Sequence, residues 1–215
     1  MNRAKIGIVT GLKAEAQWLN KAGFMVRIGG GTPHGALDAA EALAQDGAEA
    51  LISFGLAGGL RPGLKPGSIL VPSVVIYGTR AYPCDYRLIE FLGGVTVGAI
   101  LAGHKIAAST QAKALLYQRN HPAAIDLESG SVARIAKERK LPFAVLRAVA
   151  DPAERALPPA ALVALKEDGG LDIIRLMRSI ARQPWQIPRL IAVGAEARAA
   201  RQALLGRLEQ LPASP

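Results

Sequence analysis

Three carboxylates in the chain each follow a run of apolar residues typical of a buried strand. Glu15 comes shortly after the run 5–10, and Glu128 and Asp151 end two later runs. If these runs belong to one sheet, the three acids meet at one edge and could act as a proton donor, a base and an acceptor for hydroxyl groups. Each acid could instead cap a helix or lie on an exposed helix face, and spacing alone slightly favours that plainer role.

Two glycine-rich segments could bring backbone amides close to a ligand. The three glycines at 29–31 permit the positive φ angles of an anion-binding nest, although a tight turn explains the same residues equally well. The segment 55–59, Gly-Leu-Ala-Gly-Gly, could admit a ligand or a neighbouring helix. Neither segment fits a familiar nucleotide loop, because His34 occupies the last glycine position of a dinucleotide fingerprint and no Gly-Lys dipeptide exists for a Walker loop.

The apolar patterns predict the elements that must position these residues. Expected strands lie at 5–10, 24–28, 50–54, 68–77, 95–101, 124–127 and 143–149. Expected helices lie at 12–22, 37–48, 107–118, 129–140, about 158–181 and 189–210. Strands without alternation between long helices predict a mixed, mostly parallel sheet covered on both faces. We therefore expect a single-domain, three-layer α/β/α fold with a C-terminal helical extension.

Composition excludes several classes of protein. Half of the 215 residues are apolar and 20% are charged, which does not describe a disordered chain. A single cysteine, Cys84, cannot form an internal disulfide. With one cysteine and three histidines, no zinc-finger spacing exists. We expect neither a metal nor a cofactor. The uncharged windows 66–79 and 91–104 are too short to span a membrane, and Lys13 and Glu15 interrupt any leader early. We expect a cytoplasmic protein.

The net charge of +9 is concentrated near the C-terminus. Residues 1–172 contain 19 basic and 15 acidic side chains, a net of +4, and residues 173–215 contain seven arginines and two glutamates, a net of +5. We expect a catalytic domain over 1–172 and an Arg-rich helical extension over 173–215. A mildly basic body with few aromatic residues does not favour nucleic-acid binding, which remains a distant alternative.

Four segments resemble, in order and spacing, the purine nucleoside phosphorylase and nucleosidase superfamily, particularly its methylthioadenosine/S-adenosylhomocysteine nucleosidase branch. The segments are KIGIVTGLKAEA at 5–16, GLAGGL at 55–60 followed by LKPGSILV at 64–71, DLESG at 126–130, and LRAVAD at 146–151. The short chain, its triple glycine and the Arg-rich tail with Gln183-Pro-Trp resemble the hopanoid-associated phosphorylase group. By that resemblance, the reaction would release adenine from adenosylhopane in hopanoid biosynthesis, leaving ribosylhopane.

The resemblance implies catalytic roles for three residues. Asp151 would give a proton to N7 of the leaving purine, which requires a carboxyl group whose pKa is raised in a closed site. Glu15 would position or deprotonate the attacking water, and Arg147 would hold that water.

The resemblance also implies substrate contacts. Glu128 would accept hydrogen bonds from the ribose hydroxyls, and Leu127 would pack on the sugar. Ile106 would contribute to the base pocket. The remaining expected substrate contacts are Gly55, Leu56, Ala57 and Gly58.

Two residues depart from the family pattern. Leu56 stands where relatives often have a serine or threonine, and Ile52 stands where phosphate-using relatives have an arginine. Both departures favour hydrolysis over phosphorolysis. An anion site could still form at Gly30, Gly31 and Thr32, with Arg80 or Arg87 as its cation, so the nucleophile stays open between water and phosphate.

The C-terminal segment 189–211 has apolar residues near one face and arginines among the rest. Such a helix could lie on an anionic membrane, but packing on its own domain or on a second copy is slightly favoured. Residues 82–86 predict a loop near the site, and Cys84 lacks a nearby base that would make it a nucleophile. We expect a small purine nucleoside, either free or lipid-linked, as substrate and a homo-oligomer as the assembly. The alternatives are a general purine nucleoside phosphorylase or nucleosidase, or a non-catalytic nucleoside- or lipid-binding protein of the same fold.

Overall fold

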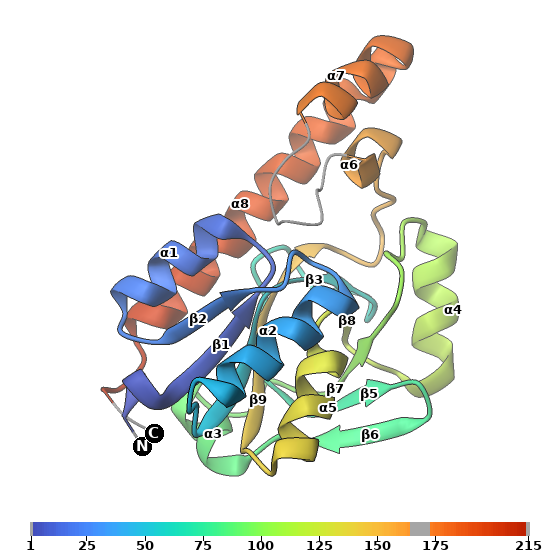
Figure 1. The fold of residues 1–215 in the computed structure, drawn as a ribbon. Helices are drawn as coiled ribbons and strands as arrows, with labels where there is room; N and C mark the ends of the chain where they lie inside the picture. Colours follow the sequence, from blue (N-terminus) through green and yellow to red (C-terminus); the bar gives the residue numbers. More distant parts are fainter. Residues whose placement is uncertain (1, 164–172, 214–215) are drawn as a thin grey trace.

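The computed structural model describes residues 2–163 and 173–213 (Figure 1). Its strands are β1 (Ile6–Thr10), β2 (Met25–Ile28), β3 (Ala50–Gly59), β4 (Ile69–Leu70), β5 (Pro72–Tyr77), β6 (Arg80–Pro83), β7 (Val97–Ala102), β8 (Ala124–Asp126) and β9 (Phe143–Asp151). Its α-helices are α1 (Lys13–Lys21), α2 (Pro33–Gln45), α3 (Tyr86–Phe91), α4 (Thr110–Asn120), α5 (Ser129–Arg139), α6 (Pro159–Val163), α7 (Ile173–Arg182) and α8 (Ile187–Glu209). Short 3₁₀ helices are η1 (Arg3–Lys5) and η2 (Pro184–Gln186).

The strands described here form one nine-stranded sheet. Hydrogen-bonded neighbours follow the order β2-β1-β3-β8-β7-β5-β6, and β9 pairs with both β3 and β4. The pairings of β8 with β3, β4 with β9 and β5 with β6 are antiparallel, whereas the other five are parallel. The predicted mixed, mostly parallel sheet is confirmed.

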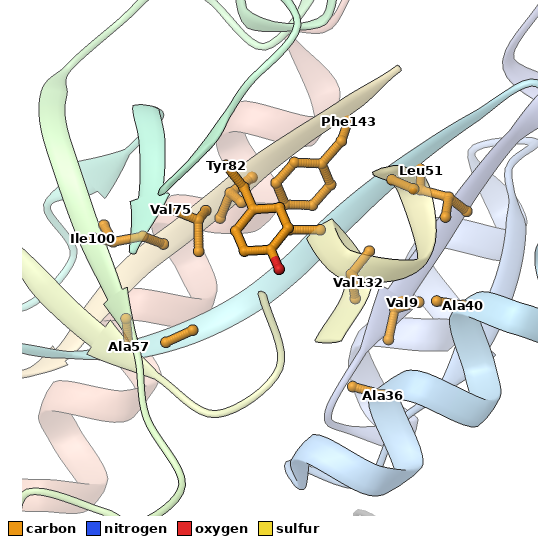
Figure 2. Close-up of a cluster of buried hydrophobic side chains, with 14 of the residues drawn as sticks. Val9, Ala36, Ala40, Leu51, Ala57, Val75, Tyr82, Ile100, Val132 and Phe143 are labelled. Carbon is orange, nitrogen blue, oxygen red and sulfur yellow. The ribbon is translucent and has the colours of Figure 1, made fainter. Parts of the chain in front are cut away.

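Helices cover both faces of the sheet. On one face, α2 and α5 pack against the strands. Figure 2 shows Val132 of α5 near Tyr82 and Phe143, and Ala36 and Ala40 of α2 near Val9 of β1. On the other face, buried apolar residues of α1, α3 and α8 pack against β1, β3 and β9. The two apolar layers confirm the predicted three-layer α/β/α fold.

The pairing of β3 with β9 positions the polar residues of the sheet edge. The parallel register places Gly55 opposite Arg147 and, after an irregularity between Ala57 and Gly58, places Gly58 opposite Asp151. The predicted strand 50–54 continues to Gly59, because its glycines leave room for polar side chains of β9 rather than ending the strand.

The C-terminal helix α8 is part of the core over its second half. Ala200, Leu204 and Leu208 are buried, and Leu211 just after the helix is buried with them. In Figure 1, α7 and the first half of α8 extend beyond the sheet. Of the two alternatives for this segment, packing on its own domain therefore accounts for the second half of α8.

Several predicted boundaries differ from the structure. The expected strand 68–77 is divided into β4 and β5. Of the loop predicted at 82–86, Tyr82 and Pro83 belong to β6, which forms a hairpin with β5 around Gly78, and Tyr86 begins α3. Cys84 and Asp85 connect the two elements. Of the helix expected over 158–181, α6 and α7 are described, and residues 164–172, with the domain boundary expected at 172, lie outside the described residues.

Candidate active site

A cavity of about 290 Å³ lies at the carboxyl ends of β1, β8 and β9. The three carboxylates singled out in the sequence, Glu15, Glu128 and Asp151, all line it. Most of its wall is apolar, from residues that include Leu12, Leu56, Ala57, Ile106, Ala107, Ile125, Leu127, Ala150, Leu157, Ala161 and Val193. The fold thus gathers the acids in a pocket that is otherwise shaped for apolar groups.

Glu15 lies in the first turn of α1 with its side chain fully buried rather than capping the helix. Its Oε2 accepts a hydrogen bond of 2.5 Å from the Thr10 hydroxyl, at the end of β1. Its Oε1 is buried and has no hydrogen-bond partner among the described residues. Burial raises the pKa of Glu15 from its ordinary 4.5 to about 7, against the lowering effects of Thr10 and of the Arg147 charge. Such a carboxyl can take up a proton at neutral pH.

Arg147, on β9, is buried beside the cavity with three polar partners. Its Nη2 donates to the Ser53 hydroxyl at 2.6 Å, and its Nη1 donates to Glu128 Oε2 at 3.2 Å. Its Nε lies 2.7 Å from Asp126 Oδ2. Asp126 also caps α5, since its Oδ1 accepts hydrogen bonds from the amide and hydroxyl of Ser129. The guanidinium therefore neutralises carboxylates of the 126–128 segment.

Gly55 makes room for this guanidinium. Its φ of +146° is strained for any residue with a side chain, and a Cβ there would lie 2.6 Å from Arg147 Nη1 and 3.2 Å from Glu15 Oε2. Gly55 therefore leaves space for the side chains of Arg147 and Glu15, whereas Leu56, Ala57 and Gly58 line the cavity itself.

Glu128 faces the triple-glycine turn. Its Oε1 accepts a hydrogen bond of 3.3 Å from the Gly31 amide, and its Oε2 is held by Arg147. Burial raises the pKa of Glu128, although the Arg147 charge opposes that effect. Gly30 and Gly31 have the positive φ angles expected of a nest, but the carboxylate that approaches them is the protein's own.

Thr32 has a structural partner as well. Its hydroxyl caps α2 by accepting a hydrogen bond from the Gly35 amide at 3.1 Å. Of the predicted anion-binding residues, Gly31 borders the cavity, and neither Gly30 nor Thr32 is among its lining residues. The Gly31 amide and the Thr32 hydroxyl are therefore engaged within the protein.

Asp151 ends β9 and forms an ion pair with Lys113 of α4, which sequence reasoning missed. The Lys113 side chain is fully buried, and its ammonium also donates to the backbone carbonyls of Pro152 at 2.7 Å and Arg155 at 3.0 Å. Burial raises the pKa of Asp151, and Lys113 lowers it in part. No motif marks Lys113, because a single lysine in a helix ordinarily lies in solvent.

Helix α8 also contributes to the site, which sequence reasoning did not predict. Val193 lines the cavity, and Glu196 forms an ion pair of 2.7 Å with Arg155, just beyond Asp151. The charge of Arg201 contributes to lowering the pKa of Glu15. The helix therefore forms a wall of the site as well as part of the core.

The segment 82–86 lies elsewhere than the sequence predicted. The segment 82–86 was expected near the site, but Tyr82, Pro83, Cys84 and Asp85 line a second cavity of about 460 Å³ beside α5, and none of them lines the first, so that expectation is wrong. The reason is the β5–β6 hairpin, which directs this segment away from the carboxyl ends of β8 and β9. Burial raises the pKa of the Cys84 thiol to about 12, which disfavours a nucleophilic thiolate.

Within residues 2–163 and 173–213, no cluster of three or more His, Cys, Asp or Glu side chains could hold a metal ion. In the same part of the chain, no helix is both long and apolar enough to cross a bilayer.

Comparison with known proteins gives a family and a fold. A family model described as the phosphorylase superfamily matches residues 9–170, which is 162 of the 215 residues. A comparison with curated proteins found no match.

Three solved structures illustrate the similarity of fold. The S-adenosylhomocysteine nucleosidase of Streptococcus pyogenes, in complex with 5-methylthiotubericidin, is 18% identical with a TM-score of 0.67, covering 99% of each chain. A mutant nucleosidase of Helicobacter pylori with 5′-methylthioadenosine in its active site is 15% identical with a TM-score of 0.68, covering 98% of this chain and 100% of that one. The methylthioadenosine/S-adenosylhomocysteine nucleosidase of Colwellia psychrerythraea, in complex with adenine, is 18% identical with a TM-score of 0.68. The match covers 100% of this chain and 98% of that one.

Proposed function

This chain belongs to the phosphorylase superfamily, and we propose that it is an enzyme that cleaves the N-glycosidic bond of an adenine nucleoside. The observation that carries the proposal is one apolar cavity lined by Glu15, Glu128 and Asp151. Burial raises the pKa of all three carboxyl groups, which favours their protonated forms relative to carboxyl groups in water. The nucleosidases of similar fold that were solved with adenine or 5′-methylthioadenosine support adenine as the base.

The proposed reaction divides the acid and base roles between Asp151 and Glu15. Asp151 gives its proton to N7 of the base as the bond to C1′ breaks, so the purine leaves neutral. Glu15, whose buried Oε1 is unpaired in the described residues, accepts a proton from the water that attacks C1′. Glu128, fixed by Arg147 and Gly31, accepts hydrogen bonds from the ribose hydroxyls, with Leu127 beside the sugar and Ile106 beside the base.

We propose water rather than phosphate as the nucleophile. Leu56 gives the cavity an apolar side chain in place of a hydroxyl, and the Ile52 side chain is buried in the core. Arg147 is already surrounded by two carboxylates and a hydroxyl, so it does not offer a free guanidinium to phosphate. Adenine release measured with and without phosphate separates the two reactions, because phosphorolysis depends on phosphate and hydrolysis does not.

We propose that the 5′ substituent is bulky and apolar, with adenosylhopane as the substrate. Leu157, Ala161 and Val193 line part of the cavity wall and give it an apolar surface. The test compares kcat/KM for adenosylhopane, 5′-methylthioadenosine and adenosine. A preference for adenosylhopane supports the proposal, equal rates identify a general purine nucleosidase, and binding without turnover identifies a non-catalytic binding protein.

We propose peripheral association with an anionic membrane through the projecting part of the C-terminal helices. Trp185 and Ile191 are 71% and 68% exposed, and the exposed Arg182 and Arg189 are next to them in the chain. Residues 173–195 contain four arginines and no acidic residue, which complements an anionic bilayer. Sedimentation with phosphatidylglycerol vesicles should carry the protein down, and the W185A/R189E variant should stay in solution. Equal sedimentation with phosphatidylcholine vesicles would contradict the charge argument.

We also propose a homo-oligomer, in line with the family resemblance. Light scattering after gel filtration measures the assembly directly, and a monomer at micromolar concentration would contradict this proposal. Running the W185A/R189E variant in parallel shows whether the exposed apolar residues serve assembly instead of membrane binding.

A further inference from the structure

Lys113 is placed unusually for a lysine of a surface helix. The side chain is fully buried, and within the described residues its ammonium donates hydrogen bonds to oxygens of the segment 151–155. A buried ammonium requires several such partners, because its loss of hydration is otherwise uncompensated. Lys113 is not among the lining residues of the cavity, whereas Asp151 is. Any effect of Lys113 on a bound ligand therefore acts through Asp151.

We propose that Lys113 is a positioning residue for the reaction: its ammonium stabilises the carboxylate that Asp151 becomes when it gives its proton to the leaving base. This inference rests on the proposed cleavage of an adenine nucleoside. One proton moves from Asp151 to N7 while the electrons of the C1′–N9 bond go to the base. The charge of Asp151 changes from zero to minus one, and the ammonium faces that charge directly. The proton lost by water to Glu15 returns through solvent to regenerate the acid.

The electrostatics around Asp151 show why such a partner is needed. Burial alone raises the pKa of Asp151, and a carboxyl group that is too weak an acid transfers its proton poorly. Glu196 on α8 raises the pKa further, although Arg155 pairs with Glu196 at 2.7 Å. Lys113 is the charge that lowers the pKa of Asp151 most. Beyond the ammonium, Glu154 interacts electrostatically with Lys113 and accepts a hydrogen bond from the Gly63 amide.

The Lys113 contacts also fix the direction of Asp151. The ammonium binds Oδ2 and, through Pro152 and Arg155, the turn that follows β9. With Oδ2 held, Oδ1 is the oxygen left to face the base. A neutral side chain at position 113 would remove both the charge and this restraint.

The test measures kcat, KM and their pH dependence for wild type, K113M, K113Q and K113R, with R119M on the exposed end of the same helix as control. We expect kcat to fall about 100-fold in K113M and K113Q, the lower end of what general acid catalysis contributes, with KM nearly unchanged. Asp151 must be protonated to act, and losing an adjacent cation raises its pKa. The alkaline limb of the K113M profile should therefore move to higher pH by about one to three units. K113R should keep most of the activity, and R119M should match wild type.

A substrate whose base needs no protonation distinguishes a loss of acid catalysis in K113M from structural damage to the site. An N7-methylated adenine nucleoside already bears a positive charge, so K113M should cleave it at nearly the wild-type rate. Equal losses on both substrates, or an unshifted alkaline limb, or an unchanged kcat in K113M, would each overturn the role of Lys113. Failure of the wild-type protein itself to release adenine would instead overturn the proposed function, so the two failures are distinguishable.

Discussion

The Thr10 hydroxyl donates a hydrogen bond to Glu15 Oε2 across 2.5 Å, and neither side chain is exposed to solvent. The bond connects the last residue of β1 with the first turn of α1. It satisfies one carboxylate oxygen and leaves Oε1 without a hydrogen-bond partner in the part of the chain that the structure describes. Glu15 is thereby fixed in orientation while one of its oxygens stays free to accept a proton.

The activity should depend on the ionisation of Glu15. Its pKa is raised to about 7 by burial, and only the ionised form can take a proton from water, so kcat/KM should rise with pH through about 7. T10V removes the hydrogen bond that favours the ionised form, and this acid limb should move to higher pH. A pH profile of adenine release measures both effects. An acid limb near 4.5, the ordinary value for a glutamate, would contradict the role of Glu15 as base.

The same burial should make Glu15 a source of instability at neutral pH. In the unfolded chain Glu15 ionises near 4.5, and in the folded chain only near 7, so stability is lost as pH rises between these values. The shift corresponds to about 3 kcal/mol in the free energy of unfolding. E15Q has no charge to bury, so above pH 7 its free energy of unfolding should exceed that of wild type by up to this amount. Below pH 4.5 this advantage should be absent. Urea unfolding below pH 4.5 and above pH 7 measures the free energy of unfolding of both proteins. If this free energy varies with pH in the same way for E15Q and wild type, the destabilising effect of Glu15 is refuted.

Arg147 should be essential to folding as well as to the site. R147M leaves Asp126 and Glu128 buried without their cation, and breaking such a buried pair typically costs about 3–5 kcal/mol. Arg134, which pairs with Glu138 on the surface of α5 at 3.6 Å, offers a matched control. R134M should change the free energy of unfolding by less than about 1 kcal/mol. Similar losses in the two variants would show that the central ion pairs contribute little.

Gly55 should tolerate no side chain, whereas another strand glycine should. In G55A the new Cβ meets Arg147 Nη1 at 2.6 Å and the backbone keeps an unfavourable φ of +146°. We expect a loss of about 1–3 kcal/mol in stability, together with lower activity as the guanidinium moves. G98A on β7 meets nothing within 4 Å and should be nearly neutral. Thermal unfolding and adenine release of both variants test this contrast, and an active, stable G55A would contradict it.

The sequence predicts the sheet and its edge well, because buried strands and the helices between them have distinct apolar patterns. Glu15, Glu128 and Asp151 converge as expected, since parallel strands bring their carboxyl ends to one edge. Lys113 could not be predicted, because its burial depends on how α4 packs against the end of β9. The contribution of Val193 could not be predicted either, because it depends on how α8, near the C-terminus, packs beside the site.

The glycine turn at 29–31 shows the limit of reading a motif alone. Its φ angles fit an anion nest, but the residue that approaches it is Glu128, which is distant in sequence. Local geometry was predictable, whereas the identity of the partner depended on tertiary structure. The same holds for Asp126, whose roles as cap of α5 and partner of Arg147 become visible only in the fold.

Adenine release from a 5′-substituted adenosine, measured for the purified protein and for D151N, decides whether this protein cleaves adenine nucleosides with Asp151 as the acid. Wild type should release adenine without phosphate. D151N, which keeps the shape of the side chain but has no proton to donate as an acid, should be slower by a factor on the order of 10² or more, with an unfolding temperature that shows the fold intact. No release by wild type with or without phosphate would contradict the proposed reaction, and equal release by D151N would contradict the role of Asp151 as its acid.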